Sequence, residues 1–430
     1  MYTENNRVKI WYEIHGEGEP TLIMVPGLQI IHSEVFKRHY VSFLSRHMRV
    51  ITLDLRGSGK SDRPDEGYDL KSYAEDIQAV VEDADLGQFA MLGVSGGAPT
   101  CIEYYTNHPD HVSQLILLNG YAKMIRSEAY PQGMPEKTLN GALKIWQDQP
   151  EDMLKVFIEL IFSEKYTLRG KELYWQWAHE TLPKIWAKGF STFTSLNVGE
   201  YLADIDLPVM IIASENDQNV FPSASDYLHQ EIEHSELKII SDAGHGCART
   251  WPQVGRTIKD FLIPDASGLD SPPKKADAPR ILWVSSPIGL GHVKRDLSVA
   301  NEMRKQMPGM IIDWLAIDPV KSCLESYGEQ IHPLSNALWD ESGHFESHAE
   351  AFSLNATEAY WVMDKLLNNN FMVFYDAVRE NHYDLVVGDE SWEVAEYLHY
   401  NPSLKTARFV FMTDFIGMTN VSDDKVEQAH

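Results

Sequence analysis

The chain has 430 residues, of which 43% are hydrophobic and 11% aromatic, and it carries a formal net charge of −26. This length exceeds what one ordinary hydrophobic core holds, so a globular protein of at least two domains is expected. The strong negative charge argues against nucleic acid or an anionic membrane surface as a partner, because phosphates would be repelled across most of the surface.

Short apolar runs alternate with amphipathic stretches over residues 1–264. The strand candidates are, in chain order, "VKIWYEIHG", "TLIMVPG", "RVITLDLRG", "FAMLGVS", "LILLNG", "VMIIASEND" and "LKIISDAGH". Helical segments such as "LKSYAEDIQAVVEDAD" fall between them. This alternation predicts an α/β fold with a mainly parallel sheet covered on both faces. Functional side chains in such sheets gather at the carboxyl ends of the strands.

One of these strands leads into a serine flanked by glycines. "FAMLGVSGGAPTCIEYY" places Ser95 between Gly93 and Gly97, after an apolar strand and before a helical run. A nucleophile elbow holds its serine on such a strand-to-helix turn, where small neighbours relieve crowding. An ordinary turn serine would satisfy the same short motif. A serine hydroxyl also needs a base and an orienting carboxylate, so these partners must decide.

The expected partners follow in the order acid, then histidine, each just past a strand. "LPVMIIASENDQNVFP" offers Asp217, and "LKIISDAGHGC" offers His245. The sequence therefore predicts a catalytic triad of Ser95, Asp217 and His245, with Glu215 as the alternative acid. Asp242 is expected to be a surface or turn residue.

Two backbone N–H groups should form the oxyanion hole. One belongs to Gly96, and the loop "LIMVPGLQ" supplies the other at Leu28, with Gln29 as a further substrate contact. Asp54 and Arg56, in "DLRGSGKS", are expected to anchor their loop instead of taking part in catalysis.

Residues 121–203 break the alternation and predict a helical cap. We expect its aromatic side chains to line an apolar substrate pocket, with packing of the cap as the alternative role for each of them. The candidates for substrate binding are Trp146, Trp175, Trp177 and Trp186.

Residues 1–264 resemble the α/β-hydrolase superfamily in its capped form. The resemblance rests on "VPGLQ", "DLRGSGKSDRP", "GVSGGAP", "SENDQNVFP" and "DAGHG". Relatives that are epoxide hydrolases or haloalkane dehalogenases have aspartate at the elbow, so Ser95 implies acyl transfer to serine. The activities that this leaves open are those of an esterase, a lipase-like hydrolase, a C–C bond hydrolase and an acyltransferase. Some relatives carry the acid after the strand that precedes the cap. That place holds Asn119 here, which favours Asp217. The resemblance implies neither a cofactor nor a metal.

Residues 265–279 are rich in Pro, Ser, Asp and Lys and are predicted to be a linker. The α/β pattern then restarts over residues 280–430. "RILWVSS", "MIIDWLAID", "YDLVVGDES" and "ARFVFMTDF" are its strand candidates, and "VKRDLSVANEMRKQ" is helical. A second, Rossmann-like α/β domain is expected.

A glycine loop, "PIGLGH", opens this second part, but the full G-x-G-x-x-G pattern of dinucleotide sites is absent. "GLGHVKRDLSVANEM" and "YDLVVGDESWEVAEYL" resemble the N-terminal half of two-Rossmann-domain glycosyltransferases. The resemblance implies a sugar-containing acceptor, with His292 as its base and Asp389 assisting. The donor-binding half of such enzymes is not present among the 430 residues, so a truncated, acceptor-binding or non-catalytic domain all stay open.

Three cysteines lie far apart, without a C-x-x-C pair, so neither a zinc site nor a disulfide framework is indicated. No signal peptide is visible, and no apolar stretch approaches the ~20 residues that span a bilayer. We therefore expect a cytoplasmic protein that acts on a small ester or acyl substrate. A ligand-binding receptor built on a hydrolase scaffold is the non-enzymatic alternative.

Overall fold

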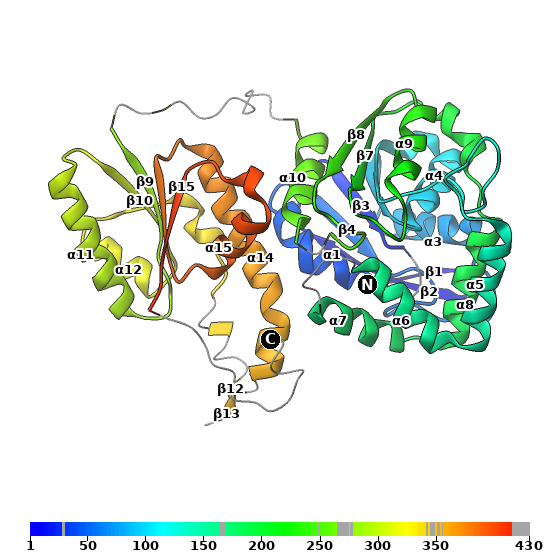
Figure 1. Ribbon diagram of the computed structural model, residues 1–430, viewed down its shortest axis with the longest axis horizontal. Coiled ribbons are helices and arrows are strands. Elements are labelled where there is room, and N and C mark those ends of the chain that lie inside the picture. Colours follow the sequence, from blue (N-terminus) through cyan, green and yellow to red (C-terminus); the bar gives the residue numbers. More distant parts are fainter. Residues whose placement is uncertain are drawn as a thin grey trace. The chain divides into compact units, whose positions relative to one another are not determined.

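The computed structural model describes residues 1–27, 31–162, 168–247, 249–264, 275, 278–340, 343–344, 349–350, 353–354 and 356–414. The chain divides into two compact units, Met1–Pro264 and Asp265–His430. Each unit has its own sheet (Figure 1). Most of the predicted linker lies outside the described residues.

The first unit is built on an eight-stranded sheet with the order β1-β2-β4-β3-β5-β6-β7-β8. All the strands predicted from the sequence for this unit are present, and the short β1 was not foreseen. Beyond the antiparallel β1–β2 and β2–β4 pairs, the neighbours are parallel. The strands are β1 (Tyr2–Asn5), β2 (Val8–His15), β3 (Thr21–Val25), β4 (Arg49–Leu53), β5 (Phe89–Val94), β6 (Val112–Leu118), β7 (Val209–Ser214) and β8 (Ser235–Ile240).

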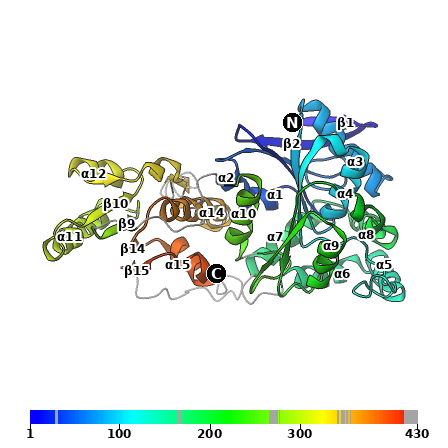
Figure 2. The ribbon, with the colours of Figure 1, turned by 90° about the horizontal axis from the view of Figure 1, so that it is seen from above.

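Helices cover both faces of this sheet, which explains why its central strands read as continuous apolar runs. Every residue of β3 and β7 is buried. Figures 1 and 2 show α1 (Glu34–His39), α2 (Val41–Leu44) and α10 (Trp251–Leu262) on one face. The other face carries α3 (Leu70–Asp83), α4 (Gly97–Asn107) and α9 (Pro222–Glu231).

Four helices follow β6 before the chain returns to the sheet at β7, and they form the cap. They are α5 (Glu136–Asp148), α6 (Pro150–Ile161), α7 (Leu168–His179) and α8 (Pro183–Ser195). A tight irregular segment, residues 121–135, precedes them and carries the isolated bridges Ile125–Met134 and Ser127–Tyr130.

The second unit contains a five-stranded parallel sheet with the order β11-β10-β9-β14-β15. Its strands are β9 (Arg280–Val284), β10 (Ile311–Leu315), β11 (Gln330–Ile331), β14 (Leu385–Asp389) and β15 (Arg408–Met412). The main helices are α11 (Leu290–Gln306), α12 (Val320–Ser326), α14 (Ala356–Glu380) and α15 (Trp392–Tyr400), and the short strands Ala349–Glu350 and Ser353–Leu354 pair separately.

The strand order of the second unit reverses between β9 and β14. The chain runs outward from β9 through β10 to β11, and then returns to add β14 and β15 on the other side. Open α/β sheets bind ligands outside the carboxyl ends of their strands at such a switch point. The hydrophobic core of this unit contains the stacked rings of Trp283 and Trp314, whose centroids lie 5.0 Å apart.

Candidate active site

Ser95 occupies a strained turn between β5 and α4. Its φ is 54°, in the left-handed region that costs an ordinary residue about 1–2 kcal/mol. Two backbone hydrogen bonds hold the turn: Ser95 N–H donates to the Leu118 carbonyl at 2.9 Å, and Ala98 N–H donates to the Ser95 carbonyl at 3.0 Å. The serine itself is half-buried. Strain that the surrounding fold maintains in this way is typical of functional sites.

The glycines around Ser95 are required by close packing. A Cβ on Gly97 would lie 2.3 Å from the Val25 carbonyl oxygen, and one on Gly93 would lie 2.6 Å from Ala98 Cα. Neither position has room for a side chain. The flanking glycines therefore let α4 start directly against the end of β3, with Ser95 at the turn.

Asp217 and His245 form a short, buried contact. His245 Nδ1 lies 2.6 Å from Asp217 Oδ2, and the two side chains are 5% and 1% exposed. Asp217 Oδ1 accepts the backbone N–H groups of Asn219 and Val220, each at 2.8 Å. Both oxygens of the carboxylate are thus paired, and the contact to Nδ1 fixes the orientation of the imidazole.

The structure describes only some of the remaining parts of the predicted catalytic centre. Within the described residues, no hydrogen bond joins the Ser95 hydroxyl to His245. The Gly96 backbone nitrogen lies 3.6 Å from where a Cβ on Gly27 would stand. Leu28 and Gln29, the other predicted oxyanion and substrate contacts, lie outside the described residues.

Asn119 fixes the histidine loop, a role that sequence reasoning missed. Its Oδ1 accepts Ser214 N–H at 2.9 Å, while its Nδ2 donates to Ser214 Oγ at 3.0 Å and to the His245 carbonyl at 2.9 Å. Asn119 is 1% exposed and has a φ of 49°. One amide therefore ties the end of β6 to the end of β7 and to the histidine. The sequence signal was an asparagine, which tolerates this left-handed backbone, directly after a strand.

Glu215 is not the residue that contacts the histidine. It is exposed, and its Oε2 accepts the backbone N–H of Asp242 at 3.0 Å. Asp242 is itself an exposed turn residue with a φ of 57°. Of the two acids considered, Asp217 is the one that pairs with His245.

Asp54 and Arg56 organise the loop after β4. The Asp54 carboxylate accepts Ser33 N–H at 2.8 Å and Lys60 N–H at 2.9 Å. The Arg56 guanidinium forms a two-point ion pair with buried Asp76, at 2.7 and 2.5 Å. These contacts give both residues structural partners.

Trp146 and Trp186 pack inside the cap. They are 1% and 2% exposed, their rings lie 6.3 Å apart, and Trp146 also contacts Phe157 and Phe190. The Trp186 ring N–H donates to the Ala178 carbonyl at 3.0 Å. Burial leaves these two rings almost no surface for a ligand, so their placement supports the packing role and not the expected substrate contact.

The other two cap tryptophans lie elsewhere. Trp177 is buried, with its ring 5.1 Å from the His32 ring and 5.6 Å from the Arg38 guanidinium. Trp175 is half-buried against His179 and Lys155. Trp177 therefore contacts His32, four residues after Leu28 in the sequence.

The cap is fastened to the histidine loop. Gly246 N–H donates to the Ile161 carbonyl, at the end of α6, at 3.1 Å. A Cβ on Gly246 would lie 3.2 Å from the side chains of both Ile161 and Phe162. The end of α6 thus lies directly over the residue that follows His245.

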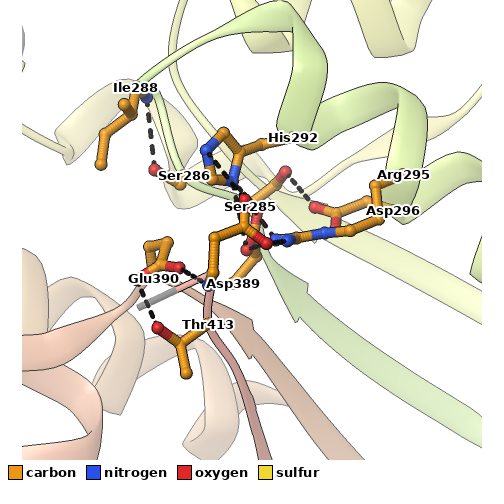
Figure 3. Close-up of polar contacts among 10 residues, drawn as sticks. Ser285, Ser286, Ile288, His292, Arg295, Asp296, Asp389, Glu390 and Thr413 are labelled. Atoms are coloured by element: carbon orange, nitrogen blue, oxygen red, sulfur yellow. Dashed lines mark hydrogen bonds and ion pairs between the residues drawn. The ribbon is translucent and has the colours of Figure 1, made fainter. Parts of the chain in front are cut away.

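In the second unit, His292 and Asp389 meet although 97 residues separate them. His292 Nδ1 lies 3.1 Å from Asp389 Oδ2 (Figure 3). Arg295, one turn further along α11, also pairs with Asp389 and with Asp414. Burial raises the Asp389 pKa above its ordinary value, while Arg295 and His292 oppose that rise.

A second buried carboxyl lies beside this pair. Asp296 is fully buried and accepts the Ser285 hydroxyl at 2.6 Å, as Figure 3 shows. Desolvation raises its pKa to about 7, and the nearby charge of Asp389 contributes to the rise. A pocket lined by Ser286, Asp389 and Glu390 opens at the carboxyl ends of β9 and β14. The predicted second-unit residues are therefore adjacent to a pocket at the switch point.

The described residues contain neither a metal-binding cluster nor a membrane-spanning helix. No group of three or more His, Cys, Asp or Glu side chains is arranged to hold a metal ion there. None of the helices described is both long enough and apolar enough to cross a membrane.

The chain is similar to known proteins over its first unit. The alpha/beta hydrolase fold family matches residues 20–246, more than half of the chain. The AB hydrolase superfamily protein YisY of Bacillus subtilis is 30% identical over 251 residues, which cover 56% of this chain and 89% of that protein. A putative non-heme chloroperoxidase of Synechocystis is 26% identical over 270 residues, covering 59% and 95% of the two chains.

Solved structures give the same picture of the fold. An esterase from Exiguobacterium antarcticum superposes with a TM-score of 0.58 at 23% identity, covering 61% of this chain and 98% of its own. The family match over residues 20–246, the sheet order and the Ser95 turn agree with one another. The chain belongs to the alpha/beta hydrolase fold family.

Proposed function

We propose that the first unit is a serine-dependent hydrolase that cleaves an ester or related acyl bond of a small, partly apolar substrate. The observation that carries this proposal is the buried 2.6 Å contact between His245 Nδ1 and Asp217 Oδ2, together with Ser95 on a left-handed turn of the same sheet edge. A serine, rather than an aspartate, at this turn supports acyl transfer. The names of the relatives, which include an esterase, agree with a hydrolase.

The proposed reaction follows from these groups. Because Nδ1 is hydrogen-bonded to Asp217, the imidazole Nε2 is free to take the Ser95 hydroxyl proton as Oγ attacks the substrate carbonyl carbon. The negative charge that develops on the carbonyl oxygen is received by the N–H groups of Gly96 and Leu28. His245 then gives the proton to the leaving oxygen as the ester C–O bond breaks. A water molecule that His245 deprotonates then attacks the acyl-enzyme. The bond to Ser95 Oγ breaks, Oγ takes the proton back from His245, and the acid is released.

A fluorophosphonate probe tests this proposal directly. Mass spectrometry of the folded full-length protein should find one adduct, on Ser95, and Ser95→Ala should abolish it. Ser223→Ala, which removes an exposed serine at the start of α9, is the matched control and should label normally. Absence of labelling at Ser95 would refute the proposal.

A panel of short and medium acyl esters then separates an enzyme from a receptor on the same scaffold. We expect turnover by the wild type and none by Ser95→Ala. Probe labelling without turnover of any ester would favour the ligand-binding alternative. Turnover that persists in Ser95→Ala would show that another residue is the nucleophile.

For the second unit, we propose the acceptor-binding half of a sugar-transferase-like activity, with His292 as the base for a hydroxyl group. The 3.1 Å contact of His292 Nδ1 with buried Asp389 supports this role: when Nδ1 donates to this carboxylate, instead of accepting from Arg295 Nη2 at 3.2 Å, Nε2 carries the lone pair. Under this proposal the unit would make the whole chain bifunctional, and the hydrolase would modify the same product.

Calorimetry of the full-length protein with nucleotide sugars and with a panel of sugars and phenols tests the second proposal. Binding of an acceptor that His292→Ala weakens, and that the exposed control His399→Ala leaves unchanged, would support it. If no compound of either class binds, the second unit has neither the donor nor the acceptor function.

A further inference from the structure

A pocket of the first unit lies between the segment that follows β6 and the loop that follows β7. Its volume is about 160 Å³, and residues of 121–135 and 219–224 line it. A cavity of about 150 Å³ is large enough to accept a benzene-sized molecule. Neither the predicted triad nor the predicted oxyanion donors line this pocket.

The wall made by residues 121–135 is held in shape by its own hydrogen bonds. Met134 N–H donates to the Met124 carbonyl at 2.7 Å, and Arg126 N–H donates to the Met134 carbonyl at 2.9 Å. Arg126 Nε also donates to the Gly133 carbonyl at 2.9 Å. The wall is therefore ordered before any ligand arrives, which lowers the entropic cost of binding.

The pocket is cationic in a strongly acidic protein. Lys123 and Arg126 line it, whereas no aspartate or glutamate does so among the described residues. Neither cation forms an ion pair with a carboxylate in the part of the chain that the structure describes. Lys123 Nζ instead contacts Ser127 Oγ at 3.2 Å and lies 5.3 Å from the Tyr130 ring centre. With 63 acidic residues against 37 basic ones in the whole chain, this local excess of positive charge favours an anion.

The rest of the wall is largely apolar and partly open. Met124, Met134 and Phe221 line it, and Phe221 is 60% exposed although it is a large hydrophobic side chain. A pocket that combines apolar walls with a few polar groups orients a ligand by its charged end. The ligand that fits this combination has a small apolar body and one negative charge.

We propose that this pocket binds a small amphipathic monocarboxylate and that its occupancy changes turnover through Asp217. The carboxylate lies toward Lys123 and Arg126, and the apolar body lies against Phe221. Val220 connects the two sites, because it lines the pocket while its N–H donates to Asp217 Oδ1 at 2.8 Å. A carboxylic acid is also the product class of the proposed hydrolysis, so the effect on turnover, though not the binding itself, rests on the proposed function.

Binding is tested by calorimetry on full-length Ser95→Ala protein, with phenylacetate as the probe and phenylacetamide as its neutral isostere. We expect one phenylacetate site per chain and markedly weaker binding of the amide. The double variant Lys123→Met/Arg126→Gln should weaken phenylacetate by about tenfold or more, since it removes two charge-assisted contacts. The double variant Lys144→Met/Lys238→Gln, which removes two exposed cations outside the pocket, should bind like the parent protein.

Three results would overturn the proposal: no phenylacetate binding, equal affinity for the amide, or equal affinity in the pocket variant and the parent. A salt series on the parent protein gives a test that does not depend on the folding of any variant. Affinity that depends on two cations must fall as ionic strength rises. Salt-independent binding therefore also counts against the site.

Modulation is tested separately by ester turnover of otherwise wild-type protein. Phenylacetate should change kcat in the wild type and in the Lys144/Lys238 control, and it should have no such effect on the Lys123/Arg126 variant. Purely competitive inhibition, equal in all three proteins, would place phenylacetate in the active site and reject the modulation. Loss of fluorophosphonate labelling at Ser95 would reject the proposed function alone, because the calorimetry does not depend on activity.

Discussion

The side-chain amide of Asn119 donates to the backbone carbonyl of His245 at 2.9 Å. The same amide also holds β7 through both the N–H and the hydroxyl of Ser214. The histidine is therefore positioned from two directions, by Asp217 on its ring and by Asn119 on its backbone.

We expect Asn119→Asp to lower kcat for ester hydrolysis by about tenfold to a hundredfold with little change in KM, because a small displacement of a catalytic group has this order of effect. The aspartate keeps an oxygen for Ser214 N–H but cannot donate to the His245 carbonyl. Steady-state kinetics measure the split between kcat and KM. Ser214→Ala, which leaves the contact to His245 in place, should cost much less. Equal losses in the two variants would mean that Asn119 acts through β7 only.

Asp217→Asn should reduce kcat by about 10⁴-fold, because the amide no longer holds the imidazole in the required tautomer. Rates on a short acyl ester provide the measurement. Glu215→Gln is the matched control: this exposed acid contacts the Asp242 turn and not His245, so turnover should be nearly unchanged. A large loss in Glu215→Gln with little effect of Asp217→Asn would reverse the assignment of the acid.

Gly97→Ala should strongly destabilise the first unit, because its Cβ would lie 2.3 Å from the Val25 carbonyl oxygen and 2.7 Å from that of Pro26. Overpacking against the backbone costs about 1–3 kcal/mol or more. Urea unfolding of the full chain measures the change. Gly87→Ala introduces the same methyl group where nothing lies within 4 Å, so it should leave the free energy of unfolding nearly unchanged. Similar stability of the two variants would contradict the packing of the Ser95 turn.

Asp296 should make the second unit less stable as pH rises. Its pKa is raised from an ordinary 3.8 to about 7, so the folded protein binds more protons than the unfolded chain between these values. Its stabilising contribution is complete below about pH 4, declines toward pH 7 and then levels off, with a slope of at most about 1.4 kcal/mol per pH unit.

Asp296→Asn keeps an acceptor for the Ser285 hydroxyl but cannot ionise. Its free energy of unfolding should therefore fall less between pH 5 and pH 8 than that of the wild type. Thermal unfolding of both proteins at the two pH values measures this difference. Because the first unit is identical in the two proteins, its own pH dependence cancels in the comparison. Glu302→Gln, an exposed change on the same helix, should follow the wild type. A pH dependence that is identical in Asp296→Asn and wild type would rule out this carboxyl as its source.

Much of the first unit could be predicted because its signals are local. Continuous apolar runs predicted the central strands, since strands covered on both faces carry no alternation. The Gly93, Ser95 and Gly97 spacing predicted the turn, because close packing there excludes side chains. The order of Asp217 and His245 after their strands was enough to predict their contact, since parallel strands end at one edge of the sheet.

The sequence could not decide which surfaces meet. Trp146 belongs to an amphipathic helix, and periodicity says that one face is buried but not whether a ligand or another helix covers it. The structure fills that face with Trp186, Phe157 and Phe190.

The role of Asn119 also depended on tertiary structure. Its partners lie 95 and 126 residues away along the chain and come together only because β6 and β7 are neighbours in the sheet. His292, in the first turn of the helix that follows β9, and Asp389, at the end of β14, meet for the same reason. The sequence alone determined the strands, the turn and the candidate groups, because these depend on neighbouring residues. The pairing of those groups was decided by strand order, which places residues far apart in the chain within hydrogen-bonding distance.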